Sequence, residues 1–287
     1  MSRSHMNKDR LAATVLRVPA IGSVLLLLTI ALFLVVESWP VMIEGGWQRF
    51  FVDQGWYPLE QRYGLMPMIV GSIAVATGAI VIAAPLGIAS AIFEVFYAPA
   101  RVARVYQLMI ALLAGIPSVV FGLWGLTVLV PLITAYQPPG ASLLAAILVV
   151  SLMILPTVAL TSKAALSGLP ASWLRGGAAL GLSRQAQITG IAIPAAQAGI
   201  AGGILLAIAR ALGETMAVLM VAGNVVAYPS SLFDPVRVLT ANIALEMAYA
   251  TGQHRAGLFV SGLLIMLMVL VLAGLAMRLN RSTQHAW

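Results

Sequence analysis

The feature that most constrains this chain is the length of its uncharged, apolar stretches. Between Val105 and Ser162 the sequence contains no Asp, Glu, Lys or Arg. A helix of about 20 apolar residues can cross the hydrocarbon core of a bilayer, where the helix itself satisfies its backbone polar groups. This stretch is long enough for two such helices, and Pro138, Pro139 and Gly140 favour a turn within it. The chain is therefore expected to be an all-α, polytopic membrane protein.

Similar stretches recur along the whole chain. Only 9% of the residues are charged, against about 25% in soluble domains, which favours a membrane domain. The first apolar segment is interpreted as a retained anchor, because Glu37 to Pro40 make a poor signal-peptide cleavage site. The predicted spans are 18–36, 66–93, 105–134, 141–162, 195–224 and 256–277.

The basic residues predict the orientation, because Lys and Arg gather on the cytoplasmic side of membrane proteins. Six spans with both termini cytoplasmic leave four arginines and six carboxylates on the outer side. The expected division is a cytoplasmic tail 1–17, a transmembrane domain 18–277 with a cytoplasmic loop 163–194, and a cytoplasmic tail 278–287. The basic residues of the inner side are Arg3, Lys8, Arg10, Arg17, Arg101, Arg104, Lys163, Arg175, Arg184, Arg278 and Arg281.

Composition argues against several kinds of chemistry. The sequence has no cysteine, and its three histidines lie outside the apolar runs, so thiol catalysis and a histidine metal site are not expected. The net charge is +7, and the basic residues flank apolar segments. This placement indicates membrane orientation and not nucleic-acid binding. A glycine-rich phosphate-binding loop of the Walker type is absent from the sequence, so any ATP must be bound by a partner. No enzyme activity, metal or cofactor is expected in this chain.

Arg210 and Glu214 lie inside the fifth apolar span. A charge near the bilayer centre costs about 2.5–3.5 kcal/mol on insertion scales, so it needs a partner or a function. Four residues apart on one helix, the two side chains would share a face and could pair. One interpretation is a structural ion pair that locks the span to its neighbours. The other is an anion gate, in which the guanidinium binds oxyanion oxygens and the glutamate competes for it.

Two further polar residues are candidates for lining a path. Pro117 is expected to break the third span, so that the Ser118 hydroxyl either lines the path or only packs. Asn224 is interpreted as either a helix cap or a path-lining amide. Gly199 and Gly203 form a GxxxG pair, which is expected to permit close helix packing.

The segment 163–194 is the only long loop predicted on the inner side. Two short helices are expected in it, at 171–182 and 184–193. Ser183 would cap the second helix and Pro194 would end it. Gly181 would allow the bend between them, because glycine accepts a positive φ without a steric penalty. Such an element, projecting from the membrane, suits docking in a partner's groove. On the outer side, a short helix is expected at 239–249.

The spacing in this loop resembles the EAA loop of ABC-importer permeases. There a Glu-Ala-Ala triplet precedes a glycine by three residues, and Ile-x-Leu-Pro follows the glycine after nine. Gly181, Ile191 and Pro194 match this spacing, Arg175 stands in place of the glutamate, and Ile193 replaces the leucine. Two apolar stretches are also similar to the phosphate-specific permeases of the PstC type, LAGIPSVVFGLWG at 113–125 and ARALGETMAVLMVAGN at 209–224.

This resemblance implies a type I ABC-importer permease fold and a role as the membrane-spanning subunit of an ATP-driven phosphate importer in the cell (inner) membrane. The implied partners are a PstA-type second permease as heterodimer, two copies of a PstB-type ATPase, a PstS-type phosphate-binding protein and membrane lipid. The candidate residues of the substrate path or gate are Arg210, Glu214, Ser118 and Asn224. The candidate residues for coupling to the ATPase are Arg175, Gly181, Ser183, Arg184, Ile191 and Pro194.

Other functions remain open at this point. A permease for another oxyanion, such as sulfate or molybdate, would use the same arginine. An ion-coupled secondary anion transporter would usually show paired repeats with broken helices in both halves, and no convincing repeat is found. A non-transporting scaffold or sensor would not need Arg210 and Glu214 buried together.

Overall fold

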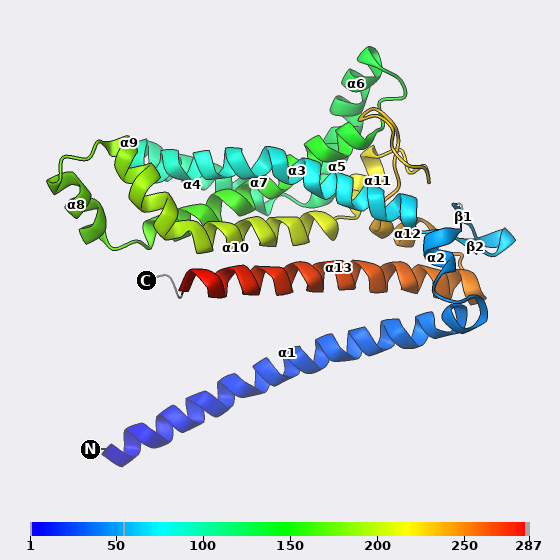
Figure 1. Cartoon of the computed structure of the whole chain (residues 1–287), viewed down its shortest axis with the longest axis horizontal. Helices are drawn as coiled ribbons and strands as arrows, with labels where there is room; N and C mark the ends of the chain where they lie inside the picture. Colours follow the sequence, from blue (N-terminus) through cyan, green and yellow to red (C-terminus); the bar gives the residue numbers. More distant parts are fainter. Residues whose placement is uncertain (1, 54, 285–287) are drawn as a thin grey trace.

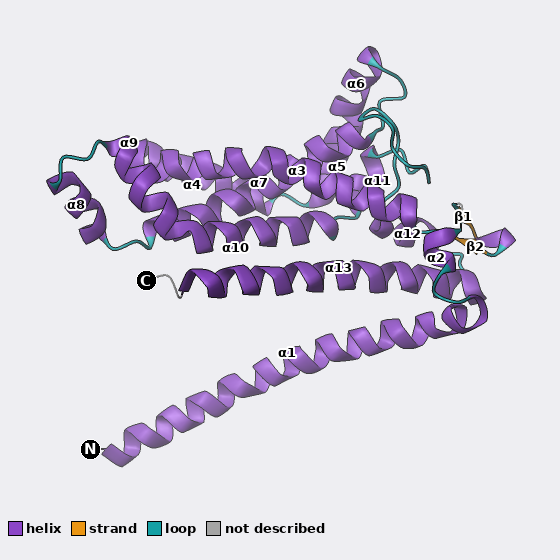
Figure 2. Cartoon of the chain, viewed as in Figure 1, coloured by secondary structure: helices purple, strands orange, loops and turns teal. Residues whose placement is uncertain are grey.

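The computed structural model of this chain describes residues 2–53 and 55–284. Figure 2 shows that helices dominate and that strands form one small hairpin. Six of the described helices are long and apolar enough to cross a membrane, which confirms the number of predicted spans. They are Val15–Glu44, Met66–Tyr97, Ser118–Tyr136, Leu143–Ser167, Arg184–Leu212 and Gly252–Leu275.

The chain can be divided into three consecutive parts, each made of several helices or strands. The first part holds α1 (Ser2–Gly45), α2 (Arg49–Val52), β1 (Trp56–Tyr57), a 3-10 turn η1 (Pro58–Glu60), β2 (Arg62–Tyr63), α3 (Met66–Ile92) and a π-helical turn η2 (Phe93–Tyr97). The second holds α4 (Ala100–Gly115), α5 (Ser118–Trp124), a π-turn η3 (Gly125–Leu129), α6 (Val130–Tyr136) and α7 (Leu143–Ser167). The third holds α8 (Ala171–Ala179), α9 (Arg184–Gln187), a π-turn η4 (Ile188–Ala192), α10 (Ile193–Leu212), α11 (Met216–Val221), α12 (Leu239–Glu246) and α13 (Gly252–Gln284).

The core consists of α3, α7 and α10, which pack against one another (Figure 1). α7 lies at its centre, because it is the most buried of the candidate spans. Small residues let the helices approach closely: a methyl group added at Gly87 would lie 2.8 Å from the Cβ of Val158. Such close backbone approach is how helices associate where lipid supplies no hydrophobic driving force. These three helices therefore form the scaffold that carries Arg210 and against which α5 and α11 pack.

α1 and α13 form a second layer beside α10. The rings of Phe33 and Phe259 meet edge to face with centroids 5.4 Å apart. In Figure 1 the N-terminal half of α1 diverges from the rest of the bundle. Its apolar side chains between Val15 and Val36 are mostly exposed, as expected for a surface that faces lipid or another membrane subunit.

α1 is much longer than the predicted span 18–36. The helix includes part of the predicted tail and the start of the predicted outer loop, and it contains Pro19 and Pro40. The boundaries differ because a helix satisfies its own backbone and need not stop where polar residues begin. The sequence before residue 18 also contains good helix formers, among them Lys8, Arg10, Leu11, Ala12 and Ala13.

The third span is broken, as predicted. α4 ends at Gly115 and α5 begins at Ser118, with Ile116 and Pro117 in extended conformation between them. Proline lacks the amide hydrogen that would continue the α4 ladder. Arg101 and Arg104 lie in the first turns of α4 and not in the predicted loop.

The segment 163–194, predicted to lie on the inner side and called the inner segment below, also differs from prediction in its boundaries. α7 continues to Ser167, so Lys163 is helical, and α8 ends at Ala179, before the predicted Leu182. The prediction that Pro194 ends the second short helix is wrong. Pro194 lies in the first turn of α10, and η4 joins α9 to α10 in one continuous helical run. The wider π-turn before Pro194 accommodates a residue that cannot donate to the ladder.

At the end of the bundle that is predicted to face outward, called the outer end below, α12 ends at Glu246, three residues before the predicted boundary. β1 and β2 pair antiparallel, with Trp56 opposite Tyr63. Figure 1 places this hairpin at one end of the bundle and α8 at the other.

Candidate functional site

Arg210 lies in the last turn of α10 and its side chain is exposed. Nη1 donates a hydrogen bond to Thr157 Oγ1 of α7, at 3.2 Å. A cation is favourable at the C-terminal end of a helix, where the carbonyl dipoles point outward. Most of the guanidinium's five donors stay available, so this group can receive an oxyanion.

Glu214 does not pair with Arg210 in this structure. α10 ends at Leu212 and Gly213 caps it, so the two charged residues do not share one helix. Glu214 is 9% exposed, and its Oε1 accepts a hydrogen bond from the Ala217 amide at 3.0 Å, in the first turn of α11. The prediction that Arg210 and Glu214 share a helix face and pair is therefore wrong. A glycine and an N-capping carboxylate divide the predicted span 195–224 in two.

Ser118 and Asn224 lie at the ends of two short helices that pack on each other. Ser118 is half-buried and begins α5, and α5 contacts α11. The contact is close, because a methyl group at Gly122 would lie 2.9 Å from Ala217 Cα. The structure therefore brings Glu214, Ser118 and Asn224 onto the α5–α11 pair, while Arg210 reaches toward α7.

Asn224 closes α11 and connects it to the following loop. It has a left-handed backbone with φ 55°. Its Nδ2 donates to the Leu219 carbonyl at 2.7 Å, and its backbone amide donates to the Val236 carbonyl at 3.1 Å. These contacts favour the cap interpretation of Asn224 over a path-lining amide.

The bend of the candidate coupling element, at Gly181 and Ser183, has the local structure that its sequence predicts. Gly181 has φ +77°, with open space around the position of a Cβ. Ser183 Oγ accepts a hydrogen bond from the Ala186 amide at 3.2 Å and caps α9. Ile191 is half-buried and packs next to Gly177, where an added methyl group would lie 2.7 Å from its Cδ1. The α8–α9 bend is thus a packed unit.

Arg175, Arg184 and Pro194 are exposed on the same inner segment. The Arg184 guanidinium lies over the Tyr97 ring, 5.1 Å from its centroid, and so ties α9 to η2. Apolar side chains are exposed beside them, with Trp173 at 52% and Leu180 at 84%. Apolar groups beside basic ones on a projecting element are typical of a docking surface.

Gly199 and Gly203 both face α7, which supports the packing interpretation of this pair. A methyl group at Gly199 would lie 2.5 Å from Ala165 Cβ, and one at Gly203 would lie 2.7 Å from Thr161 Cβ.

The sequence did not predict the ion pair between Glu94 and Lys163, which lies toward the α8 end of the bundle. Glu94 of η2 is 8% exposed and pairs with Lys163 of α7. Both residues follow apolar segments that are predicted to run toward the inner side. Opposite charges at the same end of neighbouring helices were a signal available in the sequence.

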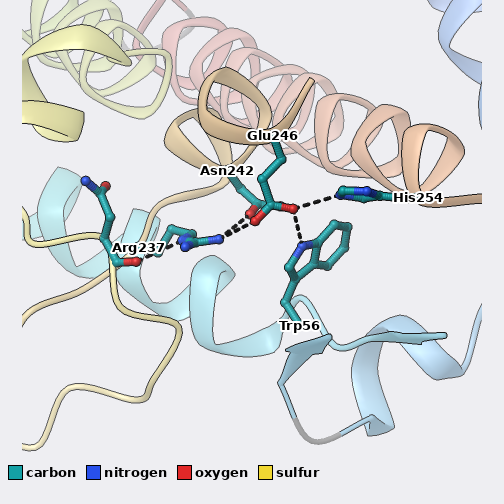
Figure 3. Close-up of polar contacts among 6 residues, drawn as sticks. Trp56, Arg237, Asn242, Glu246 and His254 are labelled. Atoms are coloured by element: carbon teal, nitrogen blue, oxygen red, sulfur yellow. Dashed lines mark hydrogen bonds and ion pairs between the residues drawn. The ribbon is translucent and has the colours of Figure 1, made fainter. Parts of the chain in front are cut away.

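A second cluster lies at the outer end, centred on the buried Glu246 (Figure 3). Its carboxylate accepts hydrogen bonds from Trp56, Arg237 and His254. Asn242 and Glu246 are four residues apart in α12, whose other residues are apolar except Thr240, and this spacing indicates a shared polar face. Within the described residues, no group of three or more His, Asp or Glu side chains could hold a metal ion.

Two groups outside the membrane-spanning segments have shifted pKa values. Burial raises the pKa of the Tyr63 phenol, and the positive charge of Arg49 opposes this shift. The pKa of Asp234 is lowered, chiefly by the hydrogen bond from the Ser230 hydroxyl and then by the Ser230 and Ser231 amides. Asp234 therefore stays ionised and organises the outer loop before α12.

Solved structures with the same fold are found among ABC importers. The chain aligns with a bacterial ABC transporter that imports the acidic polysaccharide alginate, with a TM-score of 0.66 and 14% identity, covering 97% of this chain and 98% of that one. It also aligns with the inward-facing MetNI methionine ABC transporter, with a TM-score of 0.60 and 17% identity, covering 79% and 98%. These likenesses confirm the type I importer permease fold.

Sequence relatives are permeases. The probable ABC transporter permease protein YqgH of Bacillus subtilis is 44% identical over 207 residues, which is 71% of this chain and 67% of that protein. The phosphate transport system permease protein PstC of Haemophilus influenzae is 30% identical, covering 99% of this chain and 98% of its own length. PstC of Mesorhizobium japonicum is 31% identical, covering 93% and 89%.

The family model of binding-protein-dependent transport system inner membrane components matches residues 83–285. Proteins of this family work with an ATPase, a substrate-binding protein and a second permease. The chain therefore belongs to this family, as a multi-pass permease subunit of the inner membrane that is not itself an enzyme.

Proposed function

We propose that this chain carries inorganic phosphate across the membrane as one of two permease subunits in an ATP-driven importer. The observation that carries the proposal is Arg210, an exposed guanidinium at the end of a membrane-spanning helix. Within residues 2–53 and 55–284, no carboxylate forms an ion pair with it. Relatives named as phosphate transport permeases, similar over most of their length, support phosphate as the substrate.

The physical argument rests on the cost of an unneutralised charge. A cation within a membrane-spanning segment costs about 2.5–3.5 kcal/mol on insertion scales unless it meets water, a counter-ion or a polar partner. A guanidinium offers a planar fork of donors that matches phosphate oxygens bidentately. Because Thr157 is neutral, it orients Arg210 without cancelling its charge. Arg210 is then the anion-binding group, and Glu214 acts through α11, which it caps.

Coupling to ATP is assigned to the loop 163–194. Its exposed Trp173 and Leu180 and its exposed arginines would dock on a partner ATPase. The assembly proposed is a heterodimer with a PstA-type permease, two PstB-type ATPases and a PstS-type binding protein. ATP and its metal ion would be bound by the ATPases, and this chain would hold no cofactor. Both termini would be cytoplasmic, because basic residues then gather on the inner side.

Transport of another oxyanion is the second candidate, because sulfate and molybdate also present oxygens that a guanidinium can bind. The similarity to phosphate permeases over nearly the full chain favours phosphate. An ion-coupled secondary transporter is disfavoured, since the family and the fold are those of ATP-driven importers.

The test is uptake of labelled phosphate by the four-component complex in proteoliposomes, competed with arsenate and sulfate. We expect ATP-dependent uptake that arsenate inhibits and sulfate does not. Arg210→Ala abolishes uptake, while Arg210→Lys keeps part of it, because lysine retains the charge but not the fork. Arg101→Ala is the matched control, since Arg101 is an exposed arginine of α4, outside the proposed path, the coupling loop and the hairpin. Full uptake by Arg210→Ala, or competition by sulfate as strong as by arsenate, contradicts the proposal.

The coupling element has its own test. Gly181→Ala places a side chain at φ +77°, which costs about 1–2 kcal/mol of backbone strain although the space around it is open. We expect looser coupling, with more ATP hydrolysed per phosphate transported. Gly176→Ala is the control, because Gly176 also has open space but lies within helix α8. Equal coupling ratios in the two variants contradict the role of this bend.

A further inference from the structure

The Glu246 carboxylate joins three separate parts of the outer end. Glu246 is 7% exposed. Its Oε2 accepts hydrogen bonds from Trp56 Nε1 of the hairpin at 2.7 Å and from His254 Nε2 of α13 at 2.8 Å. Its Oε1 accepts one from Arg237 Nη1 at 2.7 Å. Figure 3 shows indole, guanidinium and imidazole converging on this one carboxylate.

This arrangement fixes the relative positions of the parts it joins. Removing a carboxylate from water is costly, and here donors on both of its oxygens compensate for that cost. The loss of one partner leaves buried polar groups unpaired, so the cluster resists small displacements and rearranges as a unit. The cluster lies outside the proposed path, so substrate binding does not explain it.

Arg237 connects the cluster to α11. Besides Glu246, its guanidinium donates from Nη1 to Asn242 Oδ1 at 3.0 Å and from Nε to the Asn224 carbonyl at 2.9 Å. Asn224 in turn holds the C-terminal end of α11, through its bond to the Leu219 carbonyl.

The other end of α11 is held by the same outer segment. Thr240 Oγ1 of α12 donates to the Glu214 carbonyl at 2.7 Å. The Glu214 side chain caps α11 through the Ala217 amide. Both ends of α11 are thus attached to the segment between Arg237 and Glu246.

The hairpin side of the cluster is open to a partner. A cavity of about 690 Å³ lies beside Glu246 and His254 at the outer end. Leu59 at the tip of the hairpin is fully exposed, and Tyr249 is 65% exposed. Exposed apolar side chains around a hollow with polar groups are typical of a surface that another protein covers.

We infer that Glu246 is a positioning residue that transmits docking of the binding protein to the gate. The inference rests on the proposed function, in which a loaded binding protein docks at this end. Contact with the hairpin and α13 displaces Trp56 and His254, and these share the Glu246 carboxylate with Arg237. The displacement therefore changes the hydrogen bonds that attach both ends of α11 to the segment between Arg237 and Glu246. This in turn changes the position of Glu214 relative to Arg210.

The experiment uses the complete complex in nanodiscs and compares wild type with Glu246→Gln and Trp56→Phe. The first reading is ATP hydrolysis with and without loaded binding protein. We expect Glu246→Gln to keep basal hydrolysis and to lose its stimulation by about fivefold or more, a factor typical of energetic coupling between two sites. Trp56→Phe removes only the indole donor and loses less. Glu37→Gln makes the same change on α1, outside the hairpin and the cluster, and behaves as wild type.

The second reading is hydrogen exchange of residues 216–224 without substrate, so it does not depend on which anion is transported. We expect faster exchange in Glu246→Gln than in wild type or Glu37→Gln, because α11 loses its outer attachment. If Glu246→Gln does not assemble, Trp56→Phe decides by the same two readings.

Unchanged stimulation with unchanged exchange overturns the inference. So does an equal loss of basal and stimulated hydrolysis, which would indicate a structural role alone. Absence of phosphate uptake by the wild-type complex contradicts the proposed function instead, and the exchange of 216–224 still judges the inference.

Discussion

Gly203 and Gly202 are neighbours on α10 with opposite surroundings. A methyl group at Gly203 would lie 2.7 Å from Thr161 Cβ and closer still to its Oγ1. That hydroxyl is also bound to the Thr157 carbonyl, at 2.8 Å, so it cannot easily give way. A methyl group at Gly202 would have no heavy atom within 4 Å. Comparing Gly203→Ala with Gly202→Ala therefore isolates the effect on the packing of α10 against α7, because the other effects of an added methyl group are common to both variants.

The magnitude follows from the two opposing terms. Alanine is better than glycine in a helix interior by about 1 kcal/mol, and this gain is common to both variants. Overpacking costs about 1–3 kcal/mol and applies to Gly203→Ala alone. We therefore expect Gly202→Ala to be neutral or stabilising, and Gly203→Ala to unfold about 1–3 kcal/mol more easily than Gly202→Ala.

The assay is reversible unfolding of the purified chain by denaturing detergent in bicelles, with both variants measured against wild type. A second measurement is phosphate uptake by the complex, because α10 joins the coupling loop to Arg210 and must keep its position on α7. Equal free energies of unfolding for the two variants would refute the close α7–α10 contact and the packing role of this glycine pair.

Three further outcomes are expected. Thr157→Val removes the hydroxyl that orients the α10 arginine and should lower phosphate uptake, while Thr157→Ser retains the hydroxyl and the activity; equal uptake by both variants contradicts this role. Lys163→Met leaves Glu94 buried without its partner and should cost about 3 kcal/mol of stability, while the Lys163→Met/Glu94→Leu double variant should be closer to wild type; additive losses in an unfolding measurement argue against the pair. The pKa of Asp234 is lowered from 3.8, so its hydrogen bonds to Ser230 and Ser231 contribute above pH 3.8 and are lost as pH falls through the lower, folded-state value. Amide exchange at these two serines should therefore increase only at strongly acidic pH, relative to Asp234→Asn, and an increase near neutral pH contradicts the assignment.

Local features of the site were predictable because they depend on neighbouring residues. Gly181 occupies the positive φ expected of it, and Ser183 caps the helix that follows it. The break at Pro117 follows from a missing amide hydrogen. Errors arose where local rules conflicted. At Pro194, a π-turn upstream carries the helix past a residue expected to stop it.

The Arg210–Glu214 pair shows where spacing misleads. Two residues four apart share a face only if the helix continues through both, and this one ends at Leu212. Gly213, which lies between them in the sequence, favours a helix end at this point, because glycine weakens a helix interior. The partner of Arg210 is Thr157, 53 positions away, which no local pattern indicates.

The sequence by itself determined that the chain crosses a membrane six times, and its motifs indicated a binding-protein-dependent permease. Apolar length decides membrane crossing, because each helix satisfies its own backbone in lipid independently of the others. Tertiary structure alone decided which polar groups meet, such as Trp56 and Glu246 at 190 positions apart. Which polar groups come into contact depends on the rotation of each helix about its axis and on its position along the axes of its neighbours. Both are fixed by close packing between helices, which the order of residues along any one helix does not specify.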